Sequence, residues 1–167
     1  KTGIYKKVEP ARNCISNAMN IGNPNNLARY FYLYNGMIDK SGVVHKKPNL
    51  EEMKKHIFSV SISDRETIRM INWIYLKYDA IVEPHGAVGI AALQKYREFD
   101  KKTLAICIET AHPAKFPETI KKELKVWPVM PKSMRIIFKR KGKPYNLTKS
   151  YSAFKRFLLK DSSANPS

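Results

Sequence analysis

The sequence predicts an α/β fold with a mainly parallel sheet and flanking helices. Between residues 58 and 124, strand-like and helical patterns alternate, which is the order that such folds produce. The run 104–108 is apolar throughout, as expected for a strand buried on both faces of a parallel sheet. With 167 residues, 43% of them apolar, the chain is also large enough for a hydrophobic core.

A helix, an exposed insertion and a short strand are predicted in the first third of the chain. Apolar residues recur at helical spacing between the Asn-Pro pair at 23–24 and the Asn-Gly pair at 35–36. Residues 36–56 are rich in turn-forming residues and are expected to form an exposed insertion that ends in a short polar helix over 50–56. Apolar and small polar residues then alternate over 58–62, which is typical of a strand.

Three helices and one buried strand are predicted in the central part of the chain. Ser63 and Glu66 have the spacing of a capping box and open a helix with an apolar face. A second helix, rich in small residues, follows the Glu-Pro pair at 83–84. The strand over 103–108 comes next, and a helix over about 114–124 follows it, with a proline in its first turn.

A proline-rich linker divides the chain into two regions. Residues 1–130 are predicted to form part of the α/β domain. Residues 131–160 are a basic extension with a strand-like segment at 134–138 and a basic helix around 151–160. The tail, 161–167, is expected to be disordered.

The net charge of +17 allows two interpretations. Residues 132–160 contain no acidic side chain, and aromatic residues alternate with lysines and arginines there. Such a surface binds phosphate backbones or stacks on single strands, which describes a basic nucleic-acid-binding module. Lysine pairs recur along the whole chain, however, and no nucleic-acid motif accompanies them, so the pattern favours a solvated surface.

The cysteines and the absence of targeting patterns predict a cytoplasmic protein. Cys14 and Cys107 lack the spacings of zinc ligands or of a disulfide framework, so no metal site is expected. Cys107 lies inside the apolar run and is expected to be a buried thiol in a reducing compartment. No signal peptide or long apolar span occurs, so no membrane association is expected.

Three polar motifs are candidates for a functional site. They are Ser-Asn-Ala-Met-Asn-Ile-Gly-Asn-Pro at 16–24, Glu-Pro-His-Gly-Ala-Val at 83–88 and Thr-Ala-His-Pro-Ala-Lys-Phe at 110–116. The third motif directly follows the predicted buried strand, and open α/β sheets bind ligands where their strands end. Thr110 is therefore placed either to hydrogen-bond a ligand or to cap a turn.

Other side chains of these motifs also have a functional and a structural interpretation. The proline after His112 restricts this residue, whose ring either faces a cleft or bonds to the turn backbone. Lys115 offers charge to an anion or faces solvent. His85 begins a helix whose N–H groups suit an anion, or it is simply a helix-start residue. Ser16 and Asn17 either orient a phosphate or an amino acid, or cap the next helix.

In this order, the three motifs resemble the C-terminal part of the threonine synthase family. Thr-Gly-Ile-Tyr at 2–5 and Met-Pro at 130–131 also fit, and the resemblance extends over about residues 1–160. It implies an incomplete part of the fold-type II, tryptophan synthase β-like fold that binds pyridoxal phosphate. It also implies a lyase of amino-acid biosynthesis, which converts O-phospho-L-homoserine and water to L-threonine and phosphate.

The resemblance implies roles for individual residues. In this family, the threonine of the third motif contacts the pyridine nitrogen of the cofactor, and Thr110 occupies that position. Ser16 and Asn17 lie in a segment that borders the active site. The remaining candidates for lining residues are His85, His112 and Lys115.

This chain departs from the family pattern in two respects. The Schiff-base lysine in a Phe-Lys-Asp setting and the Gly-Asn-rich phosphate loop belong to the family's N-terminal portion, and neither occurs here. We therefore expect no catalytic residue in this segment, which is inactive alone and has the N-terminal portion as its partner. The aspartate that usually follows Ala-Met is Asn20 here. The alternative is a catalytically inactive, threonine-synthase-like binding module.

Overall fold

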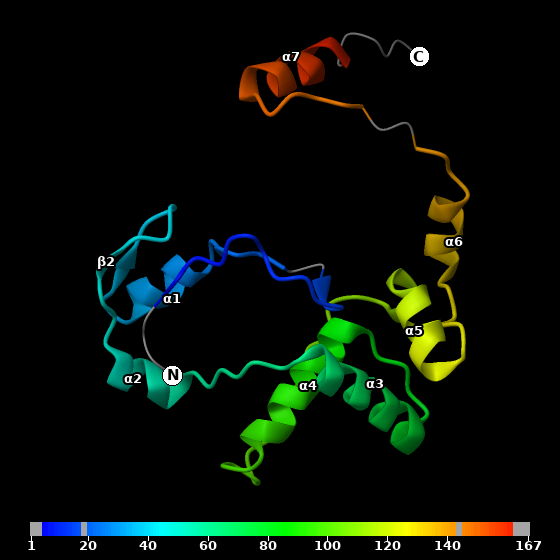
Figure 1. Cartoon of the computed structure of the whole chain (residues 1–167), viewed down its shortest axis with the longest axis horizontal. Helices are drawn as coiled ribbons and strands as arrows, with labels where there is room; N and C mark the ends of the chain where they lie inside the picture. Colours follow the sequence, from blue (N-terminus) through cyan, green and yellow to red (C-terminus); the bar gives the residue numbers. More distant parts are fainter. Residues whose placement is uncertain (1–4, 18–19, 143–144, 162–167) are drawn as a thin grey trace. The chain divides into compact units, whose positions relative to one another are not determined.

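The computed structural model describes residues 5–17, 20–142 and 145–161. The chain divides into two compact units, residues 1–129 and 130–167. The elements of the first unit are α1 Leu27–Leu33, β1 Met37–Ile38, β2 Val44–Lys46, α2 Leu50–His56, α3 Asp64–Tyr78, α4 Pro84–Tyr96, the 3-10 turn η2 Pro113–Lys115 and α5 Pro117–Leu124 (Figure 1). The second unit contains α6 Lys132–Phe138 and α7 Tyr151–Asp161.

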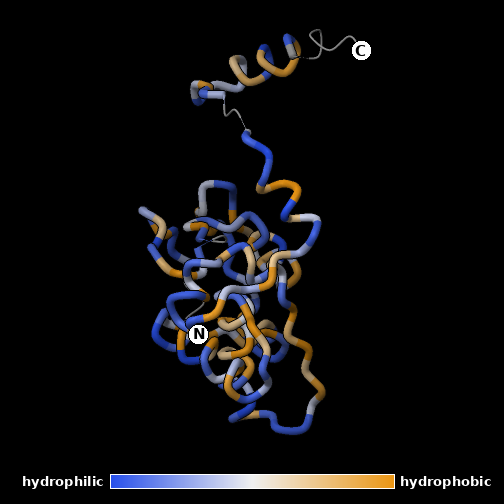
Figure 2. The backbone as a smooth tube through the Cα atoms, turned by 90° about the vertical axis from the view of Figure 1, so that its right-hand side faces the viewer, coloured by the Kyte–Doolittle hydropathy of each residue, from blue (hydrophilic) through white to orange (hydrophobic). Residues whose placement is uncertain are grey.

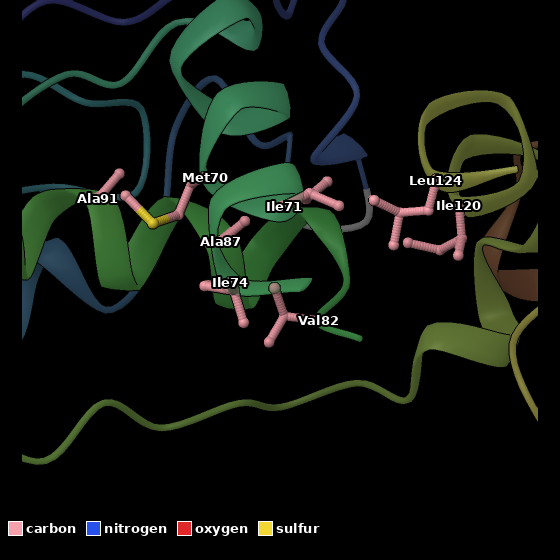
Figure 3. Packing of buried hydrophobic residues seen from close by; sticks show 8 residues of the cluster. All are labelled: Met70, Ile71, Ile74, Val82, Ala87, Ala91, Ile120 and Leu124. Carbon is pink, nitrogen blue, oxygen red and sulfur yellow. The ribbon is translucent and has the colours of Figure 1, made fainter. Parts of the chain in front are cut away.

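The core of the first unit lies where α3 packs against α4 and α5. The predicted capping box is confirmed: the Glu66 N–H donates to the Ser63 hydroxyl, and the Ser63 N–H donates to the Glu66 carboxylate at 2.7 Å. Figure 3 shows the apolar side chains of α3 directed toward the two neighbouring helices. The buried cluster consists of Met70, Ile71, Ile74, Val82, Ala87, Ala91, Ile120 and Leu124.

The insertion predicted at 36–56 forms a hairpin and a helix. β1 and β2 pair antiparallel, and Asn49 caps α2 by accepting a hydrogen bond from the Glu52 N–H at 3.2 Å. Asn23 of the first motif donates from its side-chain amide to the Lys40 carbonyl at 3.0 Å. This residue therefore joins the hairpin to the N-terminal segment.

The strands predicted at 58–62 and 103–108 are not paired in a sheet within the described residues, where the β1–β2 hairpin is the sheet. Leu104, Ile106 and Ile108 are 88%, 84% and 77% exposed. Cys107, between them, is half-buried on the side of α4, so the prediction of a buried thiol is wrong. A strand exists only where a neighbouring strand bonds to its backbone, and the described residues bring no such neighbour to this segment.

The second unit corrects one further prediction. Residues 134–138 form part of α6, which begins after Pro131 and whose Arg135 N–H donates to the Pro131 carbonyl at 3.1 Å. Apolar runs of this length do not by themselves distinguish a strand from a helix, and without a sheet to join, the segment takes the local hydrogen bonds of a helix. The basic helix predicted around 151–160 is confirmed as α7. Of the predicted disordered tail, 161–167, residue 161 ends α7 and the rest lies outside the described residues.

Hydrophobic residues occur along extended connections of the chain as well as in its helices (Figure 2). In the part of the chain that the structure describes, no helix combines the length and the apolar character that spanning a membrane requires.

Candidate functional site

The second motif begins with a carboxylate that is fully buried. Glu83 is 0% exposed and caps α4, where its Oε1 accepts from the Gly86 N–H at 2.8 Å and its Oε2 accepts from the His85 N–H at 2.9 Å. An acidic side chain at this position also favours the positive end of the helix dipole. The N–H groups that the sequence offered to an anion are thus used by the protein itself.

The imidazole of His85 connects the second motif to the third. Its Nδ1 lies against the Glu83 carboxylate, and its ring packs against that of Phe116 with centroids 5.1 Å apart. Only 13% of the His85 side chain is exposed. A buried carboxylate therefore fixes the orientation of this ring, as carboxylates do for many histidines in functional sites.

A second carboxylate holds the start of the third motif. Glu109 Oε1 accepts a hydrogen bond from the Glu83 N–H at 3.1 Å, across 26 residues of sequence. A Cβ atom added to Gly86 would lie 2.9 Å from the Glu109 Cδ, so this carboxyl group packs directly against the first turn of α4. Partial desolvation there raises the pKa of Glu109, against the lowering effect of the hydrogen bond from the Glu83 N–H, and the charge of Glu83 raises it further.

The third motif is a turn that presents Thr110 to solvent. His112 caps η2, because its Nδ1 accepts from the Ala114 N–H at 3.1 Å, and Ala114 is buried. This is the backbone contact that the structural interpretation of His112 expects. Thr110 and Lys115 are exposed.

A cavity of about 730 Å³ brings the first and second motifs together. Ser16 and His85 both line it, while Asn17 is exposed and is not part of its lining. Arg12 adds a cation to this wall, Asp64 adds a carboxylate, and Ser61 adds a hydroxyl group. Thr110, His112 and Lys115 do not line this cavity. The contact between His85 and Phe116 is what links it to the third motif.

Sequence reasoning missed Glu83, Glu109, Phe116 and Arg12. Glu83 had a readable signal, since an acidic residue directly before a helix-starting proline is a common N-cap. Glu109 and Phe116 act through partners 26 and 31 residues away, and no local pattern reveals such contacts. Within the described residues, no three His, Cys, Asp or Glu side chains form a group that suits a metal ion.

The family model "Threonine synthase, C-terminal" matches residues 86–158. The threonine synthase of Buchnera aphidicola subsp. Baizongia pistaciae is 31% identical over 160 residues, which cover 95% of this chain and 33% of the relative. That of Schizosaccharomyces pombe is 36% identical over 86 residues, which cover 48% of this chain and 16% of the relative. The chain thus spans at most about a third of the curated relatives that it matches.

A solved structure is similar in fold to nearly the whole chain. The structure of pyridoxal phosphate-bound threonine synthase from Brucella melitensis superposes with a TM-score of 0.71 at 20% identity, covering 91% of this chain and 35% of the other. This confirms the prediction of an incomplete α/β fold. By sequence and by fold, the chain corresponds to the C-terminal portion of threonine synthases.

Proposed function

We propose that this chain is the C-terminal segment of a threonine synthase that acts with pyridoxal phosphate. The reaction takes O-phospho-L-homoserine and water and gives L-threonine and phosphate. The observation that carries the proposal is the placement of Thr110, which is exposed on a turn that begins after Glu109 and ends at Phe116. The contacts of Glu109 and Phe116 hold both ends of its turn against α4.

The residues present fit one edge of the cofactor. A pyridine nitrogen needs a donor or a proton, and the Thr110 hydroxyl supplies a neutral donor. When bound, pyridoxal phosphate supplies an electron sink for reactions at the substrate's carbon atoms. Because a hydroxyl does not hold this nitrogen protonated as a carboxylate does, Thr110 moderates the sink. This suits a sequence of proton shifts in which phosphate leaves the γ carbon and water adds at the β carbon.

The cavity beside His85 fits the substrate side of the site. Arg12 offers a cation, and Ser16 supplies a hydroxyl group for a phosphorylated amino acid. Asn17 and Lys115 are exposed and therefore available to substrate or to the rest of the enzyme. The Nδ1 of His112 is engaged in capping η2, so we assign this residue a structural part in the site.

The chain needs the N-terminal portion of the enzyme as its partner. It carries no lysine in the Schiff-base motif, and covalent chemistry requires that amine. The exposed apolar side chains of Leu104, Ile106 and Ile108 support the same conclusion, because an uncovered face of this kind marks a contact surface. The two free cysteines support a reducing, cytoplasmic location.

The test uses the natural gene product that contains this chain. Supplied with pyridoxal phosphate and O-phospho-L-homoserine, it is expected to release phosphate. Replacing Thr110 by Val should weaken cofactor affinity roughly tenfold, as the loss of one well-placed hydrogen bond predicts, and Thr110→Ser should retain it. Cofactor binding without phosphate release would favour the inactive binding module. Phosphate release at enzymatic rates by the 167-residue chain alone would contradict the need for a partner.

A further inference from the structure

We infer that Glu83, His85 and Glu109 form a clamp that positions Thr110, with no part in the chemistry themselves. The inference rests on the proposed function for the role of Thr110, but the clamp itself is defined by contacts within this chain. It assigns a task to the two carboxylates that the proposed reaction does not use. We call these three residues the α4 clamp.

The start of the 110–116 turn is held by the chain segment before it. Glu109 directly precedes Thr110, and its carboxylate accepts from the Glu83 N–H. Glu83 is in turn immobilised, because both of its carboxylate oxygens accept from N–H groups in the first turn of α4. A fully buried carboxylate with these bonds has one stable orientation, so its own N–H is a fixed anchor.

The end of the turn is held by a ring contact. The His85 imidazole lies between the Glu83 carboxylate and the ring of Phe116. Phe116 closes η2, since its N–H donates to the Pro113 carbonyl at 2.9 Å. The turn is thus fastened at both ends to one helix start, while His112 braces its middle. Thr110 is left exposed between these two anchors.

The α4 clamp requires particular side chains at positions 83 and 109. Two carboxylates lie close together, and burial raises the pKa of the Glu109 carboxyl. If residue 109 only filled space, any side chain that packs well would serve. The Glu109 carboxylate instead accepts a hydrogen bond from the Glu83 N–H, and this bond fixes the direction of the Glu109 side chain. An amide oxygen at position 109 preserves that direction without the charge, so glutamine is the substitution that separates geometry from electrostatics.

The test measures the position of Thr110 apart from activity. In the natural gene product labelled with 15N-threonine, the Thr110 amide signal is assigned by its loss in Thr110→Ser. Glu109→Ala and His85→Ala are expected to shift or broaden this signal, and Glu109→Gln is expected to preserve it. The Thr67 signal, from the core of α3, should stay in place and so report an intact fold. Glu98→Ala, at an exposed position just beyond α4, is the matched control.

The second readout is the affinity for pyridoxal phosphate, followed by its absorption. Loss of the clamp should weaken binding about tenfold in Glu109→Ala, with recovery in Glu109→Gln. An unmoved Thr110 signal together with unchanged affinity in Glu109→Ala overturns the clamp and leaves the proposed function standing. Failure of the unmodified protein to bind the cofactor overturns the proposed function instead, together with the link between clamp and cofactor.

Discussion

At the scale of single residues, the carboxylate of Glu83 decides what the first turn of α4 binds. The N–H groups at a helix start attract anions, and the motif at 83–88 predicted such a helix start as a binding site for an anionic ligand. Glu83 occupies that position from within the chain, since it accepts from the N–H groups of His85 and Gly86. A buried carboxylate is tolerated only where hydrogen bonds compensate its loss of hydration. The hydrogen bonds that hold the Glu83 side chain also hold this residue where its own N–H donates to Glu109.

The substitution Gly86→Ala tests this arrangement without removing a polar group. The new methyl group would meet the Glu109 carboxyl at 2.9 Å, and this flexible side chain is expected to swing out into water. Alanine favours the helix by about 0.5–1 kcal/mol over glycine, which offsets the lost hydrogen bond, so the melting temperature should change little. Because burial raises the pKa of Glu109, its release should lower that pKa toward the ordinary value of 4.5.

The measurement is a pH titration of the Glu109 carboxyl by 13C NMR. Gly142→Ala is the matched control, because an added Cβ there meets nothing within 4 Å. An unchanged Glu109 pKa in Gly86→Ala would show that this carboxyl group does not depend on the first turn of α4.

At the scale of elements, α3 and α4 are joined by an ion pair at their surface as well as by their core. Lys95 Nζ lies 2.6 Å from Glu66 Oε1, while the other oxygen of Glu66 accepts from Ser63 at 2.7 Å. The Lys95 contact, followed by the hydrogen bonds from Ser63, lowers the pKa of Glu66 to about 2 from an ordinary value of 4.5. One side chain thus serves as a helix cap and as a link between helices.

This lowered pKa predicts a loss of stability in acid. A carboxyl group that is more acidic in the folded chain stabilises it above its unfolded pKa, and this stabilisation disappears as the pH falls from about 4.5 toward 2. In Glu66→Gln, the melting temperature should fall less steeply across that interval. Asp100, whose pKa is also about 2 because of hydrogen bonds led by the Thr103 N–H, contributes in the same interval and leaves a residual slope.

Thermal melts followed by circular dichroism across this pH interval provide the measurement. Glu98→Gln removes an exposed carboxylate just beyond α4 and is the control. A Glu66→Gln profile that runs parallel to that of the unmodified chain would rule out the ion pair as a source of acid sensitivity.

The elements that were predictable are those whose signals are local. The capping box at Ser63 and Glu66 and the Glu-Pro start at 83–84 use hydrogen bonds between near neighbours in sequence, and both predicted helices are present. The strand over 103–108 depends on partners from elsewhere, and the apolar run at 134–138 forms a helix instead. The same distinction applies to the candidate site. The three motifs could be recognised in the sequence, whereas the contact of Glu109 with Glu83 could not, because it joins residues that are 26 positions apart.

At the scale of the whole molecule, the chain spans about a third of the relatives that it matches, and it exposes a run of large apolar side chains. Leu104, Ile106 and Ile108 alternate with two half-buried residues and are all more than three-quarters exposed. Full burial of each such side chain contributes about 1.5–3 kcal/mol. An isolated chain forgoes this stabilisation and presents both an apolar stripe and an unpaired backbone to other copies of itself.

We therefore expect the isolated 167-residue chain to associate, and the triple substitution of Leu104, Ile106 and Ile108 by Ser to reduce that association. Sedimentation velocity measures this directly. Leu76→Ser removes a side chain that is 84% exposed on α3 and should have little effect, because it stands outside the stripe. If an N-terminal portion covers this stripe, adding that portion as a separate chain should suppress association of the unmodified chain. The same portion should not bind the triple variant. A monomeric unmodified chain would mean that its own residues already cover the stripe in solution, and this would contradict the proposed role of the surface as a contact for an N-terminal portion.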